Sequence, residues 1–220
     1  MRILSTVLTL GMLLGGAEAL AGGKVEKKDD TTWYVTVDKL PETVEECVAL
    51  RDEIATEPAG GMVYYLVAQL VMLDKPEVGE KCLVISLDSG ELSETIRLKK
   101  QYKRVDYKGW QLGESEVKKM KTSGFQADKA YAAKTWVLET DVKNGYELPA
   151  LPYKYFVRSH NFQNLLEKGI WKGFVNTSGN ATAAAPFQVK KNDKGIWKMF
   201  ASSSFYVGTE DPPKKVSDDL

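Results

Sequence analysis

The sequence has few of the side chains on which most metal and catalytic sites depend. It contains a single histidine, His160, and only two cysteines, Cys47 and Cys82. These three residues cannot form a structural zinc site by themselves, because such sites take four ligands. P-loop, dinucleotide-binding, EF-hand and zinc-protease motifs are also missing from the sequence. We therefore predict no metal and no cofactor.

The sequence also lacks an excess of either charge. It has 30 basic and 30 acidic residues, which gives a formal net charge of +0 at pH 7. A neutral chain lacks the long-range field with which general nucleic-acid binders attract their target. We therefore expect no nucleic-acid partner.

Apolar runs long enough to cross a membrane are missing too. Beyond the N-terminal segment, the most apolar stretch is residues 62–73, about 12 residues long, whereas a spanning helix needs about 20. We expect this stretch to be a central core helix and predict no membrane span in the mature protein.

The N-terminal segment has the layout of a secretory signal peptide. Arg2 precedes a mostly apolar run over residues 3–14, and small residues follow up to Ala21. We expect residues 1–21 to be removed by cleavage after Ala21, with cleavage after Ala19 as the alternative. Gly23 stands where a lipoprotein would have its acylated cysteine, so the protein is expected in the periplasm or outside the cell without a lipid anchor.

Both cysteines lie after the expected cleavage site. In an oxidising compartment Cys47 and Cys82 are a candidate disulfide pair. The bridge would close a loop of about 36 residues and stabilise the fold by roughly 3–4 kcal/mol. The alternative is two buried free thiols, since cysteine also packs as a small hydrophobic residue.

The chain divides into a helical part at about 41–124 and a β-rich part at about 125–208. Apolar residues recur at helical spacing in the first part, which Pro41 opens. In the second, aromatic and β-branched residues increase and turns come at short intervals. We expect an α+β fold in which the helical layer packs on a mainly antiparallel, mostly C-terminal sheet. The expected strands are 31–40, 134–142, 153–158, 170–176, 187–191 and 196–201.

We expect one domain over residues 31–208, between a flexible arm at 22–30 and a flexible tail at 209–220. Residues 93–105 predict an amphipathic helix with a basic face. That face is either solvated or a patch for an anionic polymer or a lipid head group.

Candidate ligand-binding residues lie in the β-rich part. Trp171 and Trp197 fall in predicted strands, where aromatic side chains either fill the core or line a pocket. Arg158 and His160 lie at a strand end and in the loop after it, where functional residues are frequent. No nucleophile motif surrounds a serine and no carboxylate pair stands out. We therefore assign no catalytic residue and take Arg158, His160, Trp171 and Trp197 as the ligand-binding candidates.

The C-terminal run from Ala183 to Pro213 has a distinctive order of features. A strand opened by proline leads to an N-D-x-G turn, a Trp-Lys strand, a Ser-Ser-hydrophobic run and a closing Pro-Pro. This order resembles the tails of a group of uncharacterised bacterial exported proteins. The resemblance implies an exported bacterial domain and carries no known activity. The residues that carry it are Pro186, Lys190, Asn192, Gly195, Trp197, Lys198, Ser203, Ser204, Gly208, Pro212 and Pro213.

Three functions fit these observations. The leading hypothesis is an exported, non-enzymatic envelope or secreted protein that binds a small ligand or an envelope protein. The first alternative is a hydrolase of an envelope polymer with His160 as its base. The second is a purely structural assembly protein with an apolar surface patch.

Overall fold

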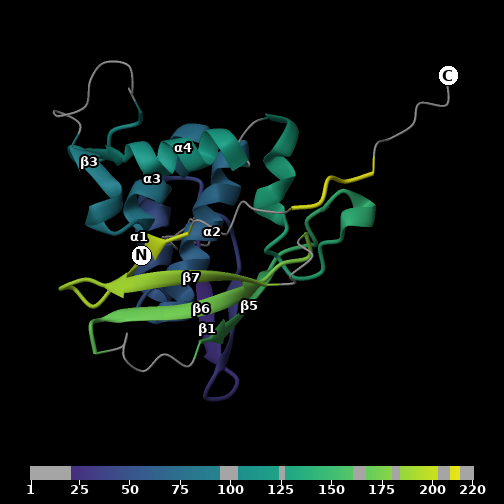
Figure 1. Cartoon of the computed structure of the whole chain (residues 1–220), viewed down its shortest axis with the longest axis horizontal. Helices are drawn as coiled ribbons and strands as arrows, with labels where there is room; N and C mark the ends of the chain where they lie inside the picture. Colours follow the sequence, from purple (N-terminus) through teal and green to yellow (C-terminus); the bar gives the residue numbers. More distant parts are fainter. Residues whose placement is uncertain are drawn as a thin grey trace, which may run out of the picture.

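The computed structural model describes residues 21–94, 104–123, 127–160, 167–179, 184–202 and 209–213. Within these residues the molecule has two layers, because helices cover one face of a six-stranded sheet (Figure 1). This is the predicted α+β fold, with the helical layer mainly from the N-terminal half and the sheet mostly from the C-terminal half.

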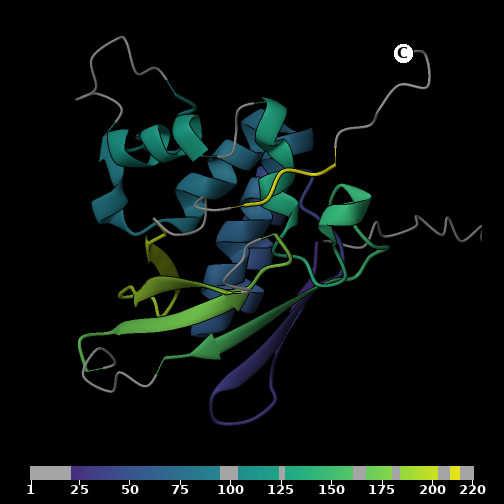
Figure 2. The same ribbon diagram turned by 45° about the vertical axis from the view of Figure 1, so that its right-hand side comes forward.

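Neighbouring strands of the large sheet are all antiparallel, in the order β1-β2-β5-β6-β7-β8. Figure 2 shows the helices on one side of this sheet and the β1–β2 hairpin at one end of it. A separate antiparallel ribbon consists of β3 and β4. The strands are β1 (Gly23–Lys27), β2 (Thr32–Val37), β3 (Leu92–Glu94), β4 (Trp110–Leu112), β5 (Tyr153–Ser159), β6 (Ile170–Asn176), β7 (Ala184–Lys191) and β8 (Trp197–Ala201).

The helix α2 forms the centre of the helical layer. It is buried without interruption from Ala59 to Val71, which explains why its sequence is apolar on all sides. None of the described helices combines the length and the apolar character that a membrane span requires. The helices are α1 (Val44–Ile54), α2 (Pro58–Asp74), α3 (Pro76–Ser86) and α4 (Glu114–Ser123), with the 3₁₀ helices η1 (Ser89–Glu91), η4 (Ala127–Lys134) and η5 (Val142–Asn144).

Two glycines, Gly60 and Gly61, lie in the first turn of α2. A Cβ atom on Gly61 would lie 2.5 Å from the carbonyl oxygen of Trp197 in β8. A Cβ atom on Gly60 would lie 1.8 Å from the carbonyl oxygen of Ile54. Only glycine therefore lets the helix backbone lie this close to the sheet and to the end of α1.

The first helix begins later than Pro41. Thr43 is its N-cap, and the Thr43 side chain accepts a hydrogen bond from the Glu46 main-chain N–H. Cys47 of α1 and Cys82 of α3 form a disulfide bond, with their Cα atoms 5.6 Å apart. The bond links the first and third helices of the layer that packs on the sheet.

The structure differs from the sequence-based expectation at three places. Residues 23–27, expected in a flexible arm, pair with β2 as the edge strand β1. Residues 134–142, expected as a strand, form the end of η4 and turns, and Glu139 has a φ of 73° that an extended strand does not allow. Residues 209–213 belong to the expected flexible tail, yet Glu210 N donates to Gly179 O at 2.7 Å and Tyr146 donates to Glu210 O.

Some expectations fall outside the described residues. These are the signal peptide up to residue 20, most of the predicted basic helix over 93–105, and tail residues 214–220. At the start of that helix the structure has β3 instead, over residues 92–94.

Candidate functional site

A cavity of about 440 Å³ lies at the β8 edge of the large sheet, and we name it the edge pocket. Four segments meet around it: the last turn of α1, the end of α3 with η1, the β3–β4 ribbon, and the β7–β8 hairpin. It is lined by Arg51, Val84, Ile85, Leu87, Asp88, Ser89, Leu92, Tyr107, Lys108, Trp110, Asn192 and Lys198.

One wall of the edge pocket is apolar. Val84, Ile85 and Leu87 are almost fully buried and come from the end of α3. Leu87 also forms a bridge with Met199 of β8, so this wall is tied to the sheet. The Trp110 side chain on the ribbon is 38 % exposed, which leaves a large aromatic surface in contact with solvent.

Lys198 brings a cation into this apolar environment. Its ammonium group donates a hydrogen bond to the main-chain carbonyl oxygen of Ile85. Burial lowers the pKa of Lys198 to about 8, and the charge of Arg51 lowers it further, while Asp52 and Asp88 raise it. The protein therefore holds an ammonium group where its charged form is disfavoured.

Two further cations and one carboxylate line the pocket. Arg51 donates from Nε and Nη2 to Asp52 Oδ1, at 2.9 and 2.6 Å. The Lys108 ammonium lies 5.3 Å from the centre of the Tyr107 ring. The Asp88 carboxylate accepts a hydrogen bond from Gly90 N at 3.1 Å.

Asp88 also lies 3.9 Å from Lys190 Nζ, outside the pocket lining. One carboxylate oxygen of Asp88, Oδ1, thus has a main-chain N–H and a lysine ammonium group as its neighbours. In the pocket lining, the three cationic side chains of Arg51, Lys108 and Lys198 outnumber the single carboxylate of Asp88.

A buried hydroxyl group lies within electrostatic reach of two residues of the edge pocket. Tyr64 of α2 is 1 % exposed, and its hydroxyl has no hydrogen-bond partner among the described residues. Burial raises the pKa of Tyr64, and the pocket residues Arg51 and Tyr107 are close enough to act on it electrostatically. Buried hydroxyl groups usually form a hydrogen bond with protein, water or ligand. The Tyr64 hydroxyl is therefore available for a hydrogen bond to water or a ligand.

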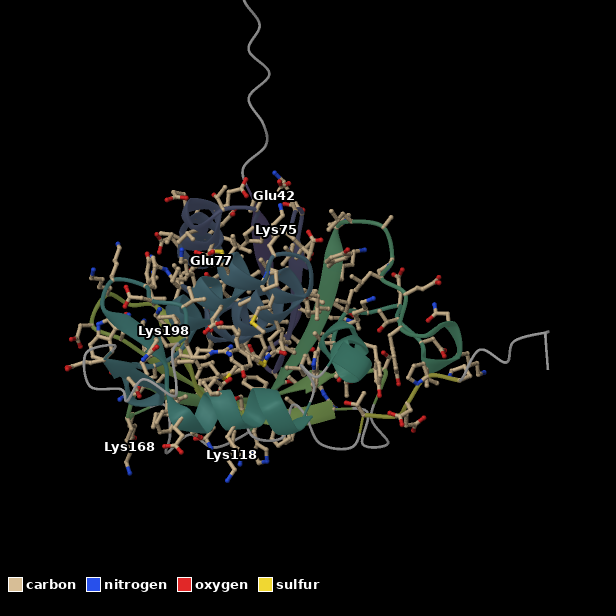
Figure 3. All side chains as sticks on the ribbon, turned by 90° about the horizontal axis from the view of Figure 1, so that it is seen from above. Glu42, Lys75, Glu77, Lys118, Lys168 and Lys198 are labelled. Carbon is tan, nitrogen blue, oxygen red and sulfur yellow. A yellow bond between two sulfur atoms is a disulfide. The ribbon has the colours of Figure 1, made fainter. Side chains whose placement is uncertain are left out.

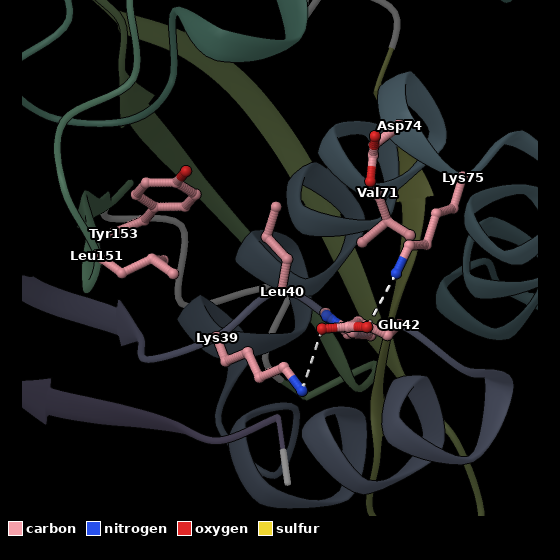
Figure 4. A pocket seen from close by; sticks show the side chains of 9 residues that line it. Lys39, Leu40, Glu42, Val71, Asp74, Lys75, Leu151 and Tyr153 are labelled. Carbon is pink, nitrogen blue, oxygen red and sulfur yellow. Dashed lines mark hydrogen bonds and ion pairs between the residues drawn. The ribbon is translucent and has the colours of Figure 1, made fainter. Parts of the chain in front are cut away.

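A second, smaller cavity of about 190 Å³ lies where the loop before α1 meets the end of α2 (Figure 4). Both of its lysines pair with one carboxylate, since Glu42 bridges Lys39 at 3.2 Å and Lys75 at 3.1 Å. Glu42 and Lys75 lie apart from Lys198 in Figure 3. The edge pocket is larger, and no carboxylate among the described residues forms an ion pair with its Lys198 ammonium group.

The structure does not gather the four sequence-based candidates at one site. Arg158 is exposed and pairs with Phe174 in the register of β5 and β6, and the His160 ring lies 5.2 Å from the Phe174 ring. Trp171 points to the helix-covered face instead, where it lies 5.4 Å from Trp33 in an edge-to-face contact. Their ligand contacts stay a prediction.

Trp197 is closer to the edge pocket than the other three, since it precedes Lys198. Its side chain is 9 % exposed, and Lys191 Nζ lies 5.7 Å from its ring centre. The sequence did not identify Lys198 as a candidate binding residue. Lys198 stands between the buried Trp197 and Met199, and this alternation indicates only that its side chain lies outside the core of the sheet. Its partner, Ile85, is 113 residues away in the chain.

Within the described residues, no three histidine, cysteine or acidic side chains gather closely enough to hold a metal ion.

Comparison with known proteins gives one informative match. No curated protein and no solved structure matches the chain. A family model described as "Domain of unknown function (DUF6935)" matches residues 39–213, which is more than half of the chain, and the protein therefore belongs to this family.

Proposed function

We propose that the protein is a non-enzymatic binding protein whose edge pocket holds a small anionic molecule with an apolar chain. The observation that carries this proposal is the position of Lys198, a cation beside an apolar wall. Its ammonium group contacts a main-chain carbonyl, where an anionic ligand would supply the missing countercharge.

The size and lining of the pocket support a ligand of this kind. A volume of about 440 Å³ falls in the range of about 300–1,000 Å³ found for small-molecule sites. The wall of Val84, Ile85 and Leu87 can bury an alkyl chain, which gains about 25 cal/mol per Å² of apolar surface. A medium-chain carboxylate such as decanoate has both parts that the lining matches.

The charges favour an anion over a cation. A carboxylate near Lys198 stabilises the charged ammonium form that burial disfavours, so ligand binding relieves a cost already present in the protein. Arg51 and Lys108 add positive charge at the same cavity. Charge-assisted hydrogen bonds of this type are about twice as strong as neutral ones.

We also propose that this binding occurs outside the cytoplasm, as an exported bacterial protein. The disulfide between Cys47 and Cys82 supports this placement, because such bonds persist in oxidising compartments. The signal-peptide layout of residues 1–21 supports it independently.

Isothermal titration calorimetry with decanoate at pH 7 tests the proposed binding, with decanol as the uncharged ligand of equal chain length. We expect decanoate to bind and decanol to bind at least about tenfold more weakly. Lys198→Met should weaken decanoate binding by a similar factor. Lys194→Met is the matched control, since Lys194 is exposed on the same hairpin and outside the pocket. Equal affinity for decanoate and decanol, or no binding of either, would contradict the proposal.

A further inference from the structure

We propose that Lys198 forms a reversible imine with the carbonyl carbon of an amphipathic oxo acid held in the edge pocket. This inference rests on the proposed binding function and adds a covalent step to it. The ligand class is a carboxylate with an apolar chain that also has an aldehyde or ketone group.

The contacts of Lys198 differ from those of its neighbours. Lys190 Nζ lies close to the Asp88 carboxylate and 5.9 Å from the Phe200 ring centre, and Lys191 lies over the Trp197 ring. Within the described part of the chain, Lys198 has a main-chain carbonyl as its partner and forms no ion pair. Its nitrogen is therefore held in place without a carboxylate that would keep it charged.

The hydrogen bond to Ile85 leaves the nitrogen able to react. A neutral amine has two N–H groups and one lone pair, so one N–H can still donate to the Ile85 carbonyl oxygen while the lone pair remains available. The partner residue thus orients the amine without blocking it.

Burial makes the neutral amine accessible near neutral pH. With a pKa of about 8, about one Lys198 in ten is uncharged at pH 7, against fewer than about one in a thousand for an ordinary lysine. Desolvation in an apolar pocket is a general way to activate a lysine for Schiff-base formation.

The reaction balances with Asp88 and one proton from solvent. The Nζ lone pair forms a bond to the carbonyl carbon, and the π pair of the carbonyl moves to its oxygen. Asp88 lines the same cavity and can carry one proton from the nitrogen to this oxygen, which gives a neutral carbinolamine. The hydroxyl group then takes up a second proton, from solvent, and leaves as water when the nitrogen lone pair forms the C=N bond of the protonated imine. One water is released, and no oxidant or reductant is needed.

The positive charges around the pocket favour a carboxylate at the end of the ligand that lies away from its carbonyl group. Arg51 and Lys108 line the same cavity and can hold the carboxylate of the oxo acid. The apolar wall covers the chain between the two groups. A simple aldehyde without a carboxylate should therefore react more slowly than the oxo acid.

Reductive trapping tests this assignment. The purified protein is incubated with 10-oxodecanoate and cyanoborohydride at pH 7, and labelled lysines are located by peptide mass spectrometry. We expect Lys198 to be labelled at least about tenfold faster than the exposed Lys194. Excess decanoate should suppress the labelling of Lys198 alone. Labelling spread evenly over exposed lysines, or unaffected by decanoate, overturns the proposal.

Calorimetry of the wild-type protein with decanoate separates this inference from the binding function. Lys198→Arg serves only as the trapping control, because arginine cannot form an imine and the label at position 198 should disappear. If the wild-type protein binds decanoate but Lys198 is not trapped, the covalent proposal fails and the binding function stands. If the wild-type protein binds no decanoate, both fail.

Discussion

The Lys198 ammonium group donates a hydrogen bond to the main-chain carbonyl oxygen of Ile85, which joins the edge strand β8 to the last turn of α3. The last carbonyl groups of a helix have no partner inside the helix, and the helix dipole favours a cation there. Lys198 thus stabilises the end of α3 and at the same time brings a charge into the edge pocket. One side chain therefore has both a structural role at the end of α3 and a proposed role in ligand binding.

The pH dependence of stability should reveal the buried ammonium group. The pKa of Lys198 is lowered to about 8 in the folded protein, from 10.5 for a free lysine side chain. Between these values the unfolded chain binds more protons than the folded one, so the free energy of unfolding rises with pH. From pH 7 to pH 10 the wild-type protein should gain about 2–3 kcal/mol relative to Lys198→Met.

Urea unfolding of the two proteins at pH 7, 8, 9 and 10 measures this difference. Lys194→Met should follow the wild-type profile, because Lys194 is exposed. Parallel profiles for wild type and Lys198→Met would show that Lys198 has an ordinary pKa in the folded protein.

The disulfide bond should make a large contribution to stability. It joins residues 35 positions apart, and a loop of this length stabilises the folded state by about 3–4 kcal/mol in the chain-entropy model. A reductant should therefore lower the melting temperature of the wild-type protein. The double variant Cys47→Ala, Cys82→Ala should melt at a similarly low temperature and not respond to reductant. A reductant effect of equal size in the double variant would contradict this assignment.

The ion pair between Glu80 and Arg104 should hold the segment before β4 against α3. Arg104 donates from Nε and Nη2 to the two carboxylate oxygens of Glu80, at 2.8 and 2.9 Å. Glu80 is 7 % exposed, so Arg104→Met leaves a largely buried carboxylate and should cost about 2 kcal/mol of unfolding free energy.

The exposed ion pair between Lys81 and Glu77, also on α3, provides the control for Arg104→Met. Lys81 donates to Glu77 at 2.9 Å, and the Glu77 side chain is 73 % exposed. Lys81→Met should therefore change the melting temperature much less than Arg104→Met. Equal changes would mean that the Glu80 pair is as weak as a surface pair.

Gly61→Ala should destabilise the protein, although alanine is the better helix former. The new Cβ would lie 2.5 Å from the Trp197 carbonyl oxygen, so α2 and β8 must separate, at a cost of about 1–3 kcal/mol. Gly90→Ala is a suitable control, since its Cβ meets nothing closer than 3.4 Å. Stabilisation by Gly61→Ala, as expected at an exposed helix position, would contradict the close packing of α2 on β8.

The alternation of apolar and polar residues predicted the strands well where one face of the strand is buried. Residues 170–176 were predicted as a strand and form β6 with the same bounds, since buried and part-buried residues alternate along it. The pattern failed at 134–142, where aromatic and β-branched residues are buried in turns rather than in a ladder. It also could not show that Gly60 and Gly61 lie within a helix, because the reason is a contact with a distant strand.

The candidate site was harder to predict than the fold. Arg158, His160, Trp171 and Trp197 were chosen for residue type and for their place on strands and loops. The edge pocket instead forms where segments distant in sequence meet, as in the contact of Lys198 with Ile85. Long-range contacts of this kind leave no periodic signal in one sequence.

The most direct test of ligand binding in the edge pocket is to map decanoate on the protein by chemical-shift changes in ¹H–¹⁵N NMR spectra. If the edge pocket holds decanoate, the largest changes will cluster around it, at the amide groups of residues 84–89, 107–110 and 192–198. Changes centred on Arg158 and His160 would place the ligand away from the edge pocket and contradict the proposed binding site. The absence of any change at saturating decanoate would contradict it as well.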